Sequence, residues 1–322
     1  MATREPPLDL FERQLESIGK QAGEWRCVIS DDCSELERYR GMERVIAGDE
    51  RFAISRSERP LGFYRNFERA LSAVPRSAEL IALADQDDRW HPDKLSTLTA
   101  EIGGAELAFS DARVVDREGR LVSERFWTRR SPNHSSLASF LISNSVPGAA
   151  ALFSRRVLEA ALPFPEAPGV PYHDHWLALV ALALGELTYI ERPLYDYVQH
   201  GEAVLGHEAT QRGAGDGVVG RAGRLLARRG RTIEAWERLY REEYERCQAL
   251  AVALRVRCAT RMEPRKLREL ERFIGIEDSA AAIAWLAVRP LRATLGRDET
   301  GGFELALLRA IAWRKLERLR RG

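Results

Sequence analysis

Residues 80–90 read Leu-Ile-Ala-Leu-Ala-Asp-Gln-Asp-Asp-Arg-Trp, an apolar run that ends abruptly in acidic side chains. Five consecutive apolar residues followed by a polar cluster are typical of a buried β-strand. Residues 25–30 form a second short apolar run, which leads into Asp31 and Asp32. Because such strands alternate with helical patterns, we predict an α/β fold with an open, mostly parallel sheet flanked by helices.

The alternation continues to about residue 206. Further strands are predicted at 51–55, 107–110, 146–153 and 187–190, and a turn is predicted at Gly119 within residues 113–122. Helices are predicted at 66–74, 91–102 and 174–184. Beyond residue 206 the strand signals vanish. We therefore divide the chain into a first domain at 1–206, a glycine-rich linker at 207–220 and a helical extension at 221–322.

The bulk composition is that of a folded chain. It has 322 residues, of which 45% are hydrophobic and 30% charged, enough to bury a sizeable core. The four cysteines contain no CxxC pair, which argues against a zinc or redox motif and fits a reducing compartment. The longest apolar runs, at 176–184 and 280–288, fall short of the ~20 residues that cross a bilayer. We expect a soluble, cytoplasmic protein without a signal peptide.

Charge is unevenly distributed. Residues 217–322 hold 24 Lys and Arg and 14 Asp and Glu, a balance of +10, so with +1 overall the preceding residues carry −9. An acidic first part suits a cation site, and a basic second part suits an anionic membrane surface or a diphosphate. A solvated Arg-rich helical surface explains the second part equally well. The basic helices are also rich in Glu and have no interleaved aromatics, which argues against nucleic-acid binding.

The acidic block contains two aspartates placed to converge. Residues i and i+2 of an extended segment point to the same side, so Asp85 and Asp87 face one region. Clustered carboxylates repel one another unless a cation lies between them. Mg²⁺ or Mn²⁺ takes such ligands and completes its shell with diphosphate oxygens. The alternative is an acidic turn that caps the helix beginning near Pro92.

Asp31 and Asp32 follow the earlier strand. Their carboxylates are able to accept hydrogen bonds from a nucleobase imide or a ribose hydroxyl. A strand-ending Asx turn is the other interpretation, and for these residues taken alone it is the stronger one.

Residues 172–176 read Tyr-His-Asp-His-Trp and precede the apolar run to residue 184. Asp174 in a cleft is a candidate general base. A carboxylate at a helix N-terminus also serves as a simple cap, so both interpretations remain open. Further along, His200 is a candidate metal or diphosphate ligand, with an ordinary surface histidine as the alternative.

These signals, in this order on one α/β scaffold, resemble family 2 glycosyltransferases with the GT-A fold, closest to bacterial rhamnosyltransferase-like members. The resemblance spans about residues 2–206. It is most specific at residues 85–95, Asp-Gln-Asp-Asp-Arg-Trp-His-Pro-Asp-Lys-Leu, which are similar to the family's Asp-x-Asp block nearly end to end. Residues 30–34, 61–67, 172–176 and 199–201 are similar to other family segments.

The resemblance implies a role for each matching residue. Asp31 would contact the pyrimidine base, and Thr3, Asp32, Asp85 and Asp88 would line the nucleotide-sugar site. Asp87 with Asp85, and His200, would ligate Mg²⁺ or Mn²⁺. Asp174 would deprotonate the acceptor hydroxyl, and Trp90, His173 and Trp176 would lie near the acceptor.

The resemblance further implies an inverting transfer of a sugar, with rhamnose as one candidate. The donor would be UDP-, dTDP- or GDP-linked. The acceptor would be a cell-surface polysaccharide or a lipid-linked saccharide, and the basic helices would hold the protein at the inner face of the cell membrane.

The chain departs from the family at its start. Residues 1–5 begin almost at the turn that follows the family's first strand, so that strand is expected to be missing or nearly so. An alternative function follows: a catalytically weak or inactive relative that serves as a binding or scaffold subunit. A nucleotidyltransferase is a third reading, but the Gly-rich phosphate loop that it needs is absent from the sequence.

Overall fold

The computed structural model describes residues 1–128, 131–199, 233–291, 300 and 302–321. Three parallel strands form a small sheet in the order β1–β2–β3, with bounds Ala2–Thr3, Cys27–Asp31 and Phe52–Arg56. A larger sheet has the order β4–β8–β6–β9–β5, with β7 paired to β6. Its strands are β4 (Leu80–Ala82), β5 (Arg89–Trp90), β6 (Leu107–Asp116), β7 (Leu121–Ser123), β8 (Ala151–Ser154) and β9 (Leu187–Gln199).

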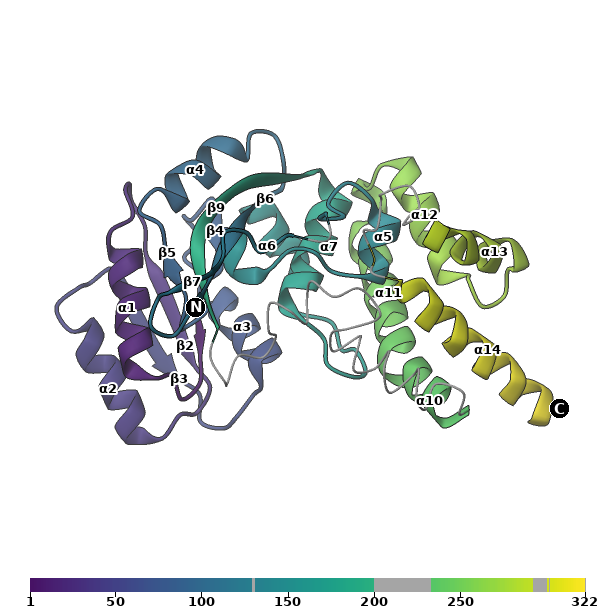
Figure 1. Cartoon of the computed structure of the whole chain (residues 1–322), viewed down its shortest axis with the longest axis horizontal. Helices are drawn as coiled ribbons and strands as arrows, with labels where there is room; N and C mark the ends of the chain where they lie inside the picture. Colours follow the sequence, from purple (N-terminus) through teal and green to yellow (C-terminus); the bar gives the residue numbers. More distant parts are fainter. Residues whose placement is uncertain (129–130, 200–232, 292–299, 301, 322) are drawn as a thin grey trace.

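Helices flank both sheets in the first part of the chain (Figure 1). They are α1 (Leu8–Gly19), α2 (Leu36–Ile46), α3 (Phe63–Ser72), α4 (Lys94–Glu101), α5 (Leu137–Ile142), α6 (Arg155–Ala161) and α7 (His173–Leu184), with a 3₁₀ turn η1 at Gly148–Ala150. The second part holds α10 (Ile233–Arg238), a π-helix η2 (Leu239–Tyr244), α11 (Glu245–Cys258), a 3₁₀ turn η3 (Ala259–Arg261), α12 (Pro264–Ile274), α13 (Ala280–Val288) and α14 (Phe303–Arg321). The predicted α/β class with a C-terminal helical extension is confirmed.

Strand directions are more mixed than the alternation of strands and helices predicted. The β1–β2, β2–β3 and β6–β9 pairs are parallel, whereas β4–β8, β6–β8, β5–β9 and β6–β7 are antiparallel. The expectation of a mostly parallel sheet is therefore wrong for the larger sheet. The linear pattern marks where strands occur, but the connection between two strands decides their relative direction.

The first strand is short, as expected. Ala2 lies opposite Ser30 and Thr3 opposite Asp31, so β1 pairs only with β2. Across the gap to the larger sheet, the Arg4 backbone N–H donates to Oε1 of Gln86 at 2.9 Å, and Nε2 of Gln86 donates back to the Arg4 carbonyl at 3.4 Å. In the described residues, side-chain bonds rather than strand pairing thus connect the end of β1 to the acidic block.

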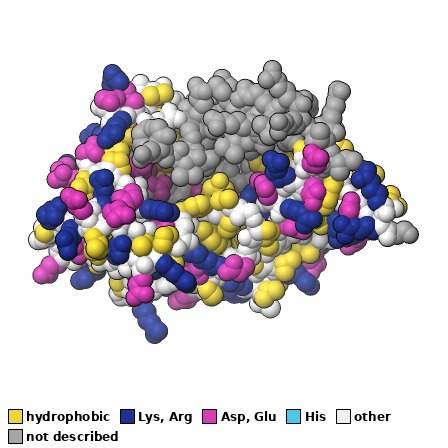
Figure 2. All heavy atoms as spheres, turned by 90° about the horizontal axis from the view of Figure 1, so that it is seen from below, with side chains coloured by type: hydrophobic (Ala, Val, Ile, Leu, Met, Phe, Trp, Pro, Cys, Tyr) yellow, Lys and Arg dark blue, Asp and Glu magenta, His cyan; other side chains and the backbone are white. Residues whose placement is uncertain are grey.

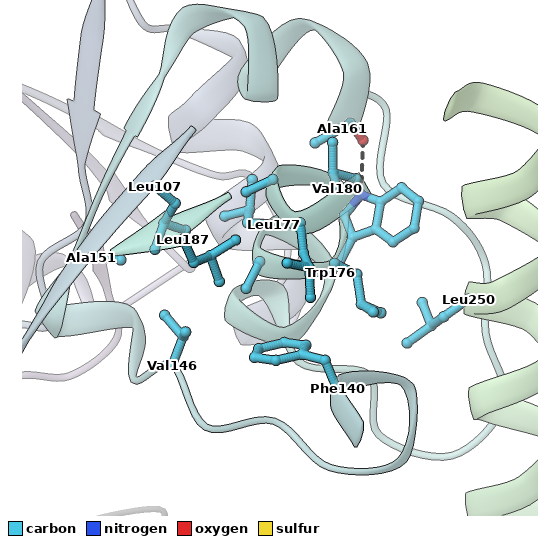
Figure 3. Packing of buried hydrophobic residues seen from close by; sticks show 14 of the residues in the cluster. Leu107, Phe140, Val146, Ala151, Ala161, Trp176, Leu177, Val180, Leu187 and Leu250 are labelled. Carbon is cyan, nitrogen blue, oxygen red and sulfur yellow. Dashed lines mark hydrogen bonds between the residues drawn. The ribbon is translucent and has the colours of Figure 1, made fainter. Parts of the chain in front are cut away.

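Helix α7 is the centre of the core. Eleven of its twelve residues are buried, and Asp174 is the exception. A helix that is apolar all round must be enclosed by other elements, and α5, α6 and β6 pack around α7 from the first part of the chain. Trp176 lies on this helix with no exposed surface, beside Phe140 and near Leu250 of α11 (Figure 3).

The helical extension shares this core. Helix α11 packs on α7, and α12 packs on α5 (Figure 1). On the face shown in Figure 2, Lys and Arg are interspersed with Asp and Glu. Within the described parts of the chain, no helix is both long and apolar enough to span a bilayer. The linker predicted at 207–220 lies outside the described residues.

Candidate functional site

The acidic block follows β4, and the turn to β5 carries three aspartates. Asp85 and Asp87 are partly exposed, and Asp88 is buried. Burial, followed by the neighbouring carboxylates of Asp87 and Asp174, raises the pKa of Asp85 to about 7. A negative charge on any one of these groups therefore opposes ionisation of the others. Two segments distant in sequence, the acidic block and the start of α7, thus share one electrostatic environment.

Asp88 points to the inner side of this block. Its Oδ1 accepts a hydrogen bond from the Val198 backbone N–H at 3.3 Å, while its buried Oδ2 has no partner. Burial raises the pKa of Asp88 well above its usual value, and the charges of Asp85 and Asp87 add to the effect. An unpartnered buried oxygen costs free energy unless a ligand, water or proton satisfies it.

The protein side chains supply only part of the ligand set that a divalent cation needs at this site. No three His, Cys, Asp or Glu side chains converge as a metal-binding set in the described ranges. The partly exposed carboxylates of Asp85 and Asp87 suit Mg²⁺ or Mn²⁺, which commonly binds one or two carboxylates and takes the rest of its shell from phosphate oxygens and water. His200, the third predicted ligand, lies outside the described residues.

Asp174 lies in the first turn of α7 and is held by donors from two segments. Its Oδ1 accepts the His175 backbone N–H at 2.6 Å. It also accepts hydrogen bonds from the Gly148 backbone N–H and the Asn144 side chain. Burial raises its pKa to about 6 even though these hydrogen bonds favour the ionised form. The N-cap residue of α7 is Tyr172, so Asp174 is not the cap; it keeps exposed surface, and its role as general base stays a prediction.

His173 lies beside Asp174 and has no hydrogen-bond partner. It is 8% exposed, and both ring nitrogens are buried and unpaired. Its ring stacks on Phe67 with 3.5 Å between centroids and 14° between planes. Burial lowers its pKa to about 3, so the imidazole is neutral at physiological pH.

The two predicted acceptor tryptophans are both buried. Trp176 is fully buried, and its Nε1–H donates to the Ala161 carbonyl at 3.0 Å. The expected contact of Trp176 with an acceptor is therefore wrong, because the ring has no surface to offer. Trp90 is 5% exposed, and its backbone N–H donates to Oγ of Ser17 at 2.9 Å. Its indole Nε1 is unpartnered and buried, so contact of Trp90 with an acceptor stays a prediction.

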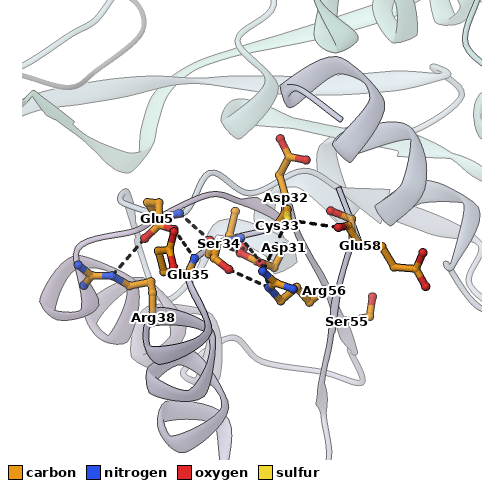
Figure 4. A network of polar contacts seen from close by, with 12 residues as sticks. Glu5, Asp31, Asp32, Cys33, Ser34, Glu35, Arg38, Ser55, Arg56 and Glu58 are labelled. Atoms are coloured by element: carbon orange, nitrogen blue, oxygen red, sulfur yellow. Dashed lines mark hydrogen bonds and ion pairs between the residues drawn. The ribbon is translucent and has the colours of Figure 1, made fainter. Parts of the chain in front are cut away.

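Asp31 and Asp32 organise the turn after β2 (Figure 4). Asp31 accepts the Ser34 backbone N–H at 2.9 Å, the Ser34 hydroxyl at 2.5 Å and the Thr3 hydroxyl at 3.3 Å. Asp32 accepts the backbone N–H groups of Leu61 at 2.5 Å and Gly62 at 2.9 Å. Asp31 thus accepts the backbone N–H three residues on, one residue further than an Asx turn requires, and contact of Thr3, Asp31 or Asp32 with a nucleotide stays a prediction.

Lys94 is a site residue for which no local sequence pattern predicted a role. Its side chain is fully buried, and its Nζ donates to the Ala149 carbonyl. The ammonium lies 4.1 Å from the Trp90 ring centroid and 4.4 Å from that of Tyr195. Burial lowers the pKa of Lys94 to about 7 against the opposing effect of the Asp88 and Asp85 charges. A lysine nine residues after Asp85 signals nothing by itself, since lysine is usually exposed.

The comparisons with known proteins agree with this fold. The structure of S. aureus TarS 1-349 in complex with UDP-GlcNAc is similar, with a TM-score of 0.54 and 14% identity over 99% of this chain and 90% of that chain. The structure of S. aureus TarS 1-349 in complex with UDP has a TM-score of 0.52 and 12% identity over the same shares. At such identities the likeness establishes the fold alone. No curated protein sequence matches the chain.

The family comparison is independent of these structures. The model described as Glycosyl transferase family 2 matches residues 5–161. This segment contains the acidic block, Lys94 and the η1 turn, and it ends before Asp174. Residues 5–161 are thus similar to a glycosyltransferase family 2 domain.

Proposed function

We propose that this protein transfers a sugar from a nucleoside-diphosphate donor to a hydroxyl group of an acceptor. The observation that carries the proposal is the shared electrostatic environment of Asp85, Asp87 and Asp174 within and beside the segment similar to a glycosyltransferase family 2 domain. Asp85 and Asp87 would bind the leaving diphosphate through a cation. The partly exposed carboxylate of Asp174 on α7 would face the incoming hydroxyl. Both functions are needed on opposite sides of the same sugar carbon.

The first requirement is to stabilise the departing diphosphate. Asp87 and Asp85 would hold Mg²⁺ or Mn²⁺, which supplies Lewis-acid neutralisation of the diphosphate when bound. Asp85 fits this task because burial, and then repulsion from neighbouring carboxylates, raises its pKa to about 7, and a bound cation offsets both effects. The unpartnered Oδ2 of Asp88 would accept a hydrogen bond from a donor hydroxyl.

The second requirement is to deprotonate the attacking hydroxyl. With a pKa of about 6, Asp174 is mostly ionised at pH 7 and is close to the optimum for a general base. It would take the acceptor proton while the acceptor oxygen bonds to the anomeric carbon. The bond from that carbon to the diphosphate oxygen breaks, and its electron pair leaves with the nucleoside diphosphate. A single displacement of this kind inverts the anomeric configuration.

Further contacts follow from the remaining unpaired groups. The neutral His173 ring, with both nitrogens free, would exchange a hydrogen bond with a sugar hydroxyl. The turn held by Asp31 and Asp32 would bind the nucleotide. A uridine donor is a reasonable first candidate, because the similar TarS structures contain UDP-GlcNAc and UDP.

The finer assignments rest on the sequence resemblance. Rhamnose as the sugar, a cell-surface polysaccharide or lipid-linked acceptor, and peripheral contact with anionic membrane through the basic helices are part of the proposal. The interspersed charges in Figure 2 favour a solvated surface on that face of the molecule.

A donor screen tests the proposal. The protein is incubated with Mn²⁺ and UDP-, dTDP- and GDP-sugars, and released nucleoside diphosphate is measured with and without a chelator. We expect metal-dependent release with at least one donor. Asp87→Ala should abolish it, and Asp174→Ala should lower it by about 10²–10⁴-fold. Asp9→Ala, which removes an exposed carboxylate paired with Arg117, is the matched control and should leave the rate unchanged.

Two outcomes would contradict the proposal in different ways. Full activity in Asp87→Ala would exclude its metal role. Tight nucleotide binding without turnover of any donor would instead favour the binding or scaffold subunit.

A further inference from the structure

We propose that Lys94 is a positioning residue that fixes the η1 turn and, through it, the orientation of Asp174. This inference rests on the proposed function, because it assigns to Lys94 the task of aligning the general base with the acidic block. The residues concerned come from α4, η1 and α7, which are remote in sequence.

The first step is the confinement of the Lys94 side chain. It has no exposed surface, and its Nζ lies over the rings of Trp90 on β5 and Tyr195 on β9, at 4.1 and 4.4 Å from their centroids. Cation–π attraction of this kind is strongest where water is excluded. The two rings hold the ammonium in place. The position from which Nζ donates its hydrogen bond to the Ala149 carbonyl is therefore fixed.

The second step runs from Ala149 to the base. Ala149 is the middle residue of the η1 turn, and the preceding Gly148 donates its backbone N–H to the Asp174 carboxylate. A Cβ atom on Gly148 would lie 2.9 Å from Nε2 of His173 and 3.5 Å from Cβ of Asp174. The turn is therefore packed directly against α7, and a shift of Ala149 is transmitted to the donor that orients Asp174.

The third step concerns charge. The Lys94 ammonium attracts Asp88 and Asp85 and thus ties the same lysine to the acidic block. One buried cation thereby links the segment that would bind the diphosphate to the segment that would hold the base. Misplacement of a reacting group by about 1 Å lowers turnover by roughly 10²-fold, so such a link has a kinetic consequence.

Lys266 provides a matched control. It is also a buried lysine, at 8% exposed, and its Nζ also binds a backbone carbonyl, that of Gly185 at 2.8 Å, together with Glu186 at 2.6 Å. It anchors the opposite end of α7, remote in sequence from the acidic block. Lys266→Met therefore reproduces the loss of stability caused by removing a buried amine, but it leaves the contacts of η1 intact.

The kinetic test compares Lys94→Met with Lys266→Met. The donor is whichever nucleotide sugar the wild type turns over, and p-nitrophenyl glycosides serve as acceptors. We expect the ratio of sugar transfer to donor hydrolysis to fall by at least about tenfold in Lys94→Met, with donor KM within roughly threefold of wild type. In Lys266→Met the ratio should stay at the wild-type value. An unchanged ratio in folded Lys94→Met would overturn the inference.

A second measurement needs no substrate. Amide hydrogen exchange of the peptide containing Gly148 should be about tenfold faster in Lys94→Met and unchanged in Lys266→Met, because only the first variant releases the turn. Equal protection in both variants would overturn the inference. Lys94→Gln, which removes the charge but keeps a polar side chain, takes its place if the Met variant does not fold. Failure of the wild type on every donor would count against the proposed function alone, since exchange still reports on Lys94.

Discussion

Asp174 combines partial exposure with a raised pKa, and this pairing gives the residue a measurable signature. A general base acts only when ionised, so activity should rise as pH increases through about 6 and level off above pH 7. The measurement is kcat/KM from pH 5 to 8 at saturating metal. In Asp174→Asn the residual activity should no longer rise as pH increases through about 6. A wild-type rate that stays constant or falls with increasing pH would exclude the base role.

His175 should make the fold sensitive to acid. Burial lowers its pKa to about 4, and the ring binds the Phe140 carbonyl through Nε2 at 2.8 Å. The unfolded chain binds a proton at about pH 6.5, so the stability due to His175 is complete above that pH and is lost as pH falls towards 4. The full difference is about 3 kcal/mol. Urea unfolding of His175→Gln should show a shallower loss of stability over this range, whereas an unchanged slope would contradict the assignment.

At the residue level, the sequence predicted groups that act through short-range spacing. The i, i+2 spacing predicted that Asp85 and Asp87 converge, and the structure has both in the turn between β4 and β5, where the Asp87 charge raises the pKa of Asp85. The role of Lys94 depends on Ala149, 55 residues further on, and no local pattern indicates that contact. Trp176 was misplaced for the same reason: an aromatic next to a candidate base resembles an acceptor contact, and only tertiary packing shows that it belongs to the core.

The η1 turn is the element that the site depends on most closely. Gly148→Ala should lower activity by about tenfold or more, because the new Cβ would lie 2.9 Å from His173 and push the turn from Asp174. The cost in stability should be about 1–3 kcal/mol. Gly104→Ala is the control, since its Cβ would meet no atom within 4 Å. Wild-type activity in Gly148→Ala would show that the turn adapts without moving the base.

Element positions were predicted better than element ends. The strand expected at 107–110 continues to Asp116 as β6, because its pairing with β9 continues through a register shift at Asp111. The strand expected at 146–153 starts only at Ala151, after the 3₁₀ turn. Helix α4 starts at Lys94 rather than His91, because the His91 backbone N–H donates to Leu194 of β9. In each case a partner strand decided the boundary.

At the scale of the whole molecule, the helical extension should be part of one cooperative unit. Arg257 of α11 donates to the carbonyls of Ala161 at 2.6 Å and Pro163 at 2.5 Å, and lies 5.3 Å from the Trp176 ring centroid. Arg257→Ala should destabilise the protein by about 1–3 kcal/mol, because it leaves carbonyls unpaired at the junction. Denaturant unfolding should remain a single transition, since one core cluster runs through both parts.

Arg255 on the same helix is the control. Its ion pair with Glu271, at 3.8 Å, is about half exposed on both sides, so Arg255→Ala should cost less than about 1 kcal/mol. Two separate transitions, or equal effects of the two substitutions, would show that the extension is an independent unit. The sequence predicted that this region is helical, but its docking on α5 and α7 depends on surface shape that no periodicity encodes.

The central claim is that Asp85 and Asp87 bind a cation that holds a diphosphate opposite Asp174. Crystals soaked with Mn²⁺ and UDP test it most directly, through the anomalous signal of the metal. We predict a peak within coordination distance of the Asp87 or Asp85 carboxylate, with the diphosphate between it and Asp174. A metal bound elsewhere, or a diphosphate bound away from these side chains, would contradict the account.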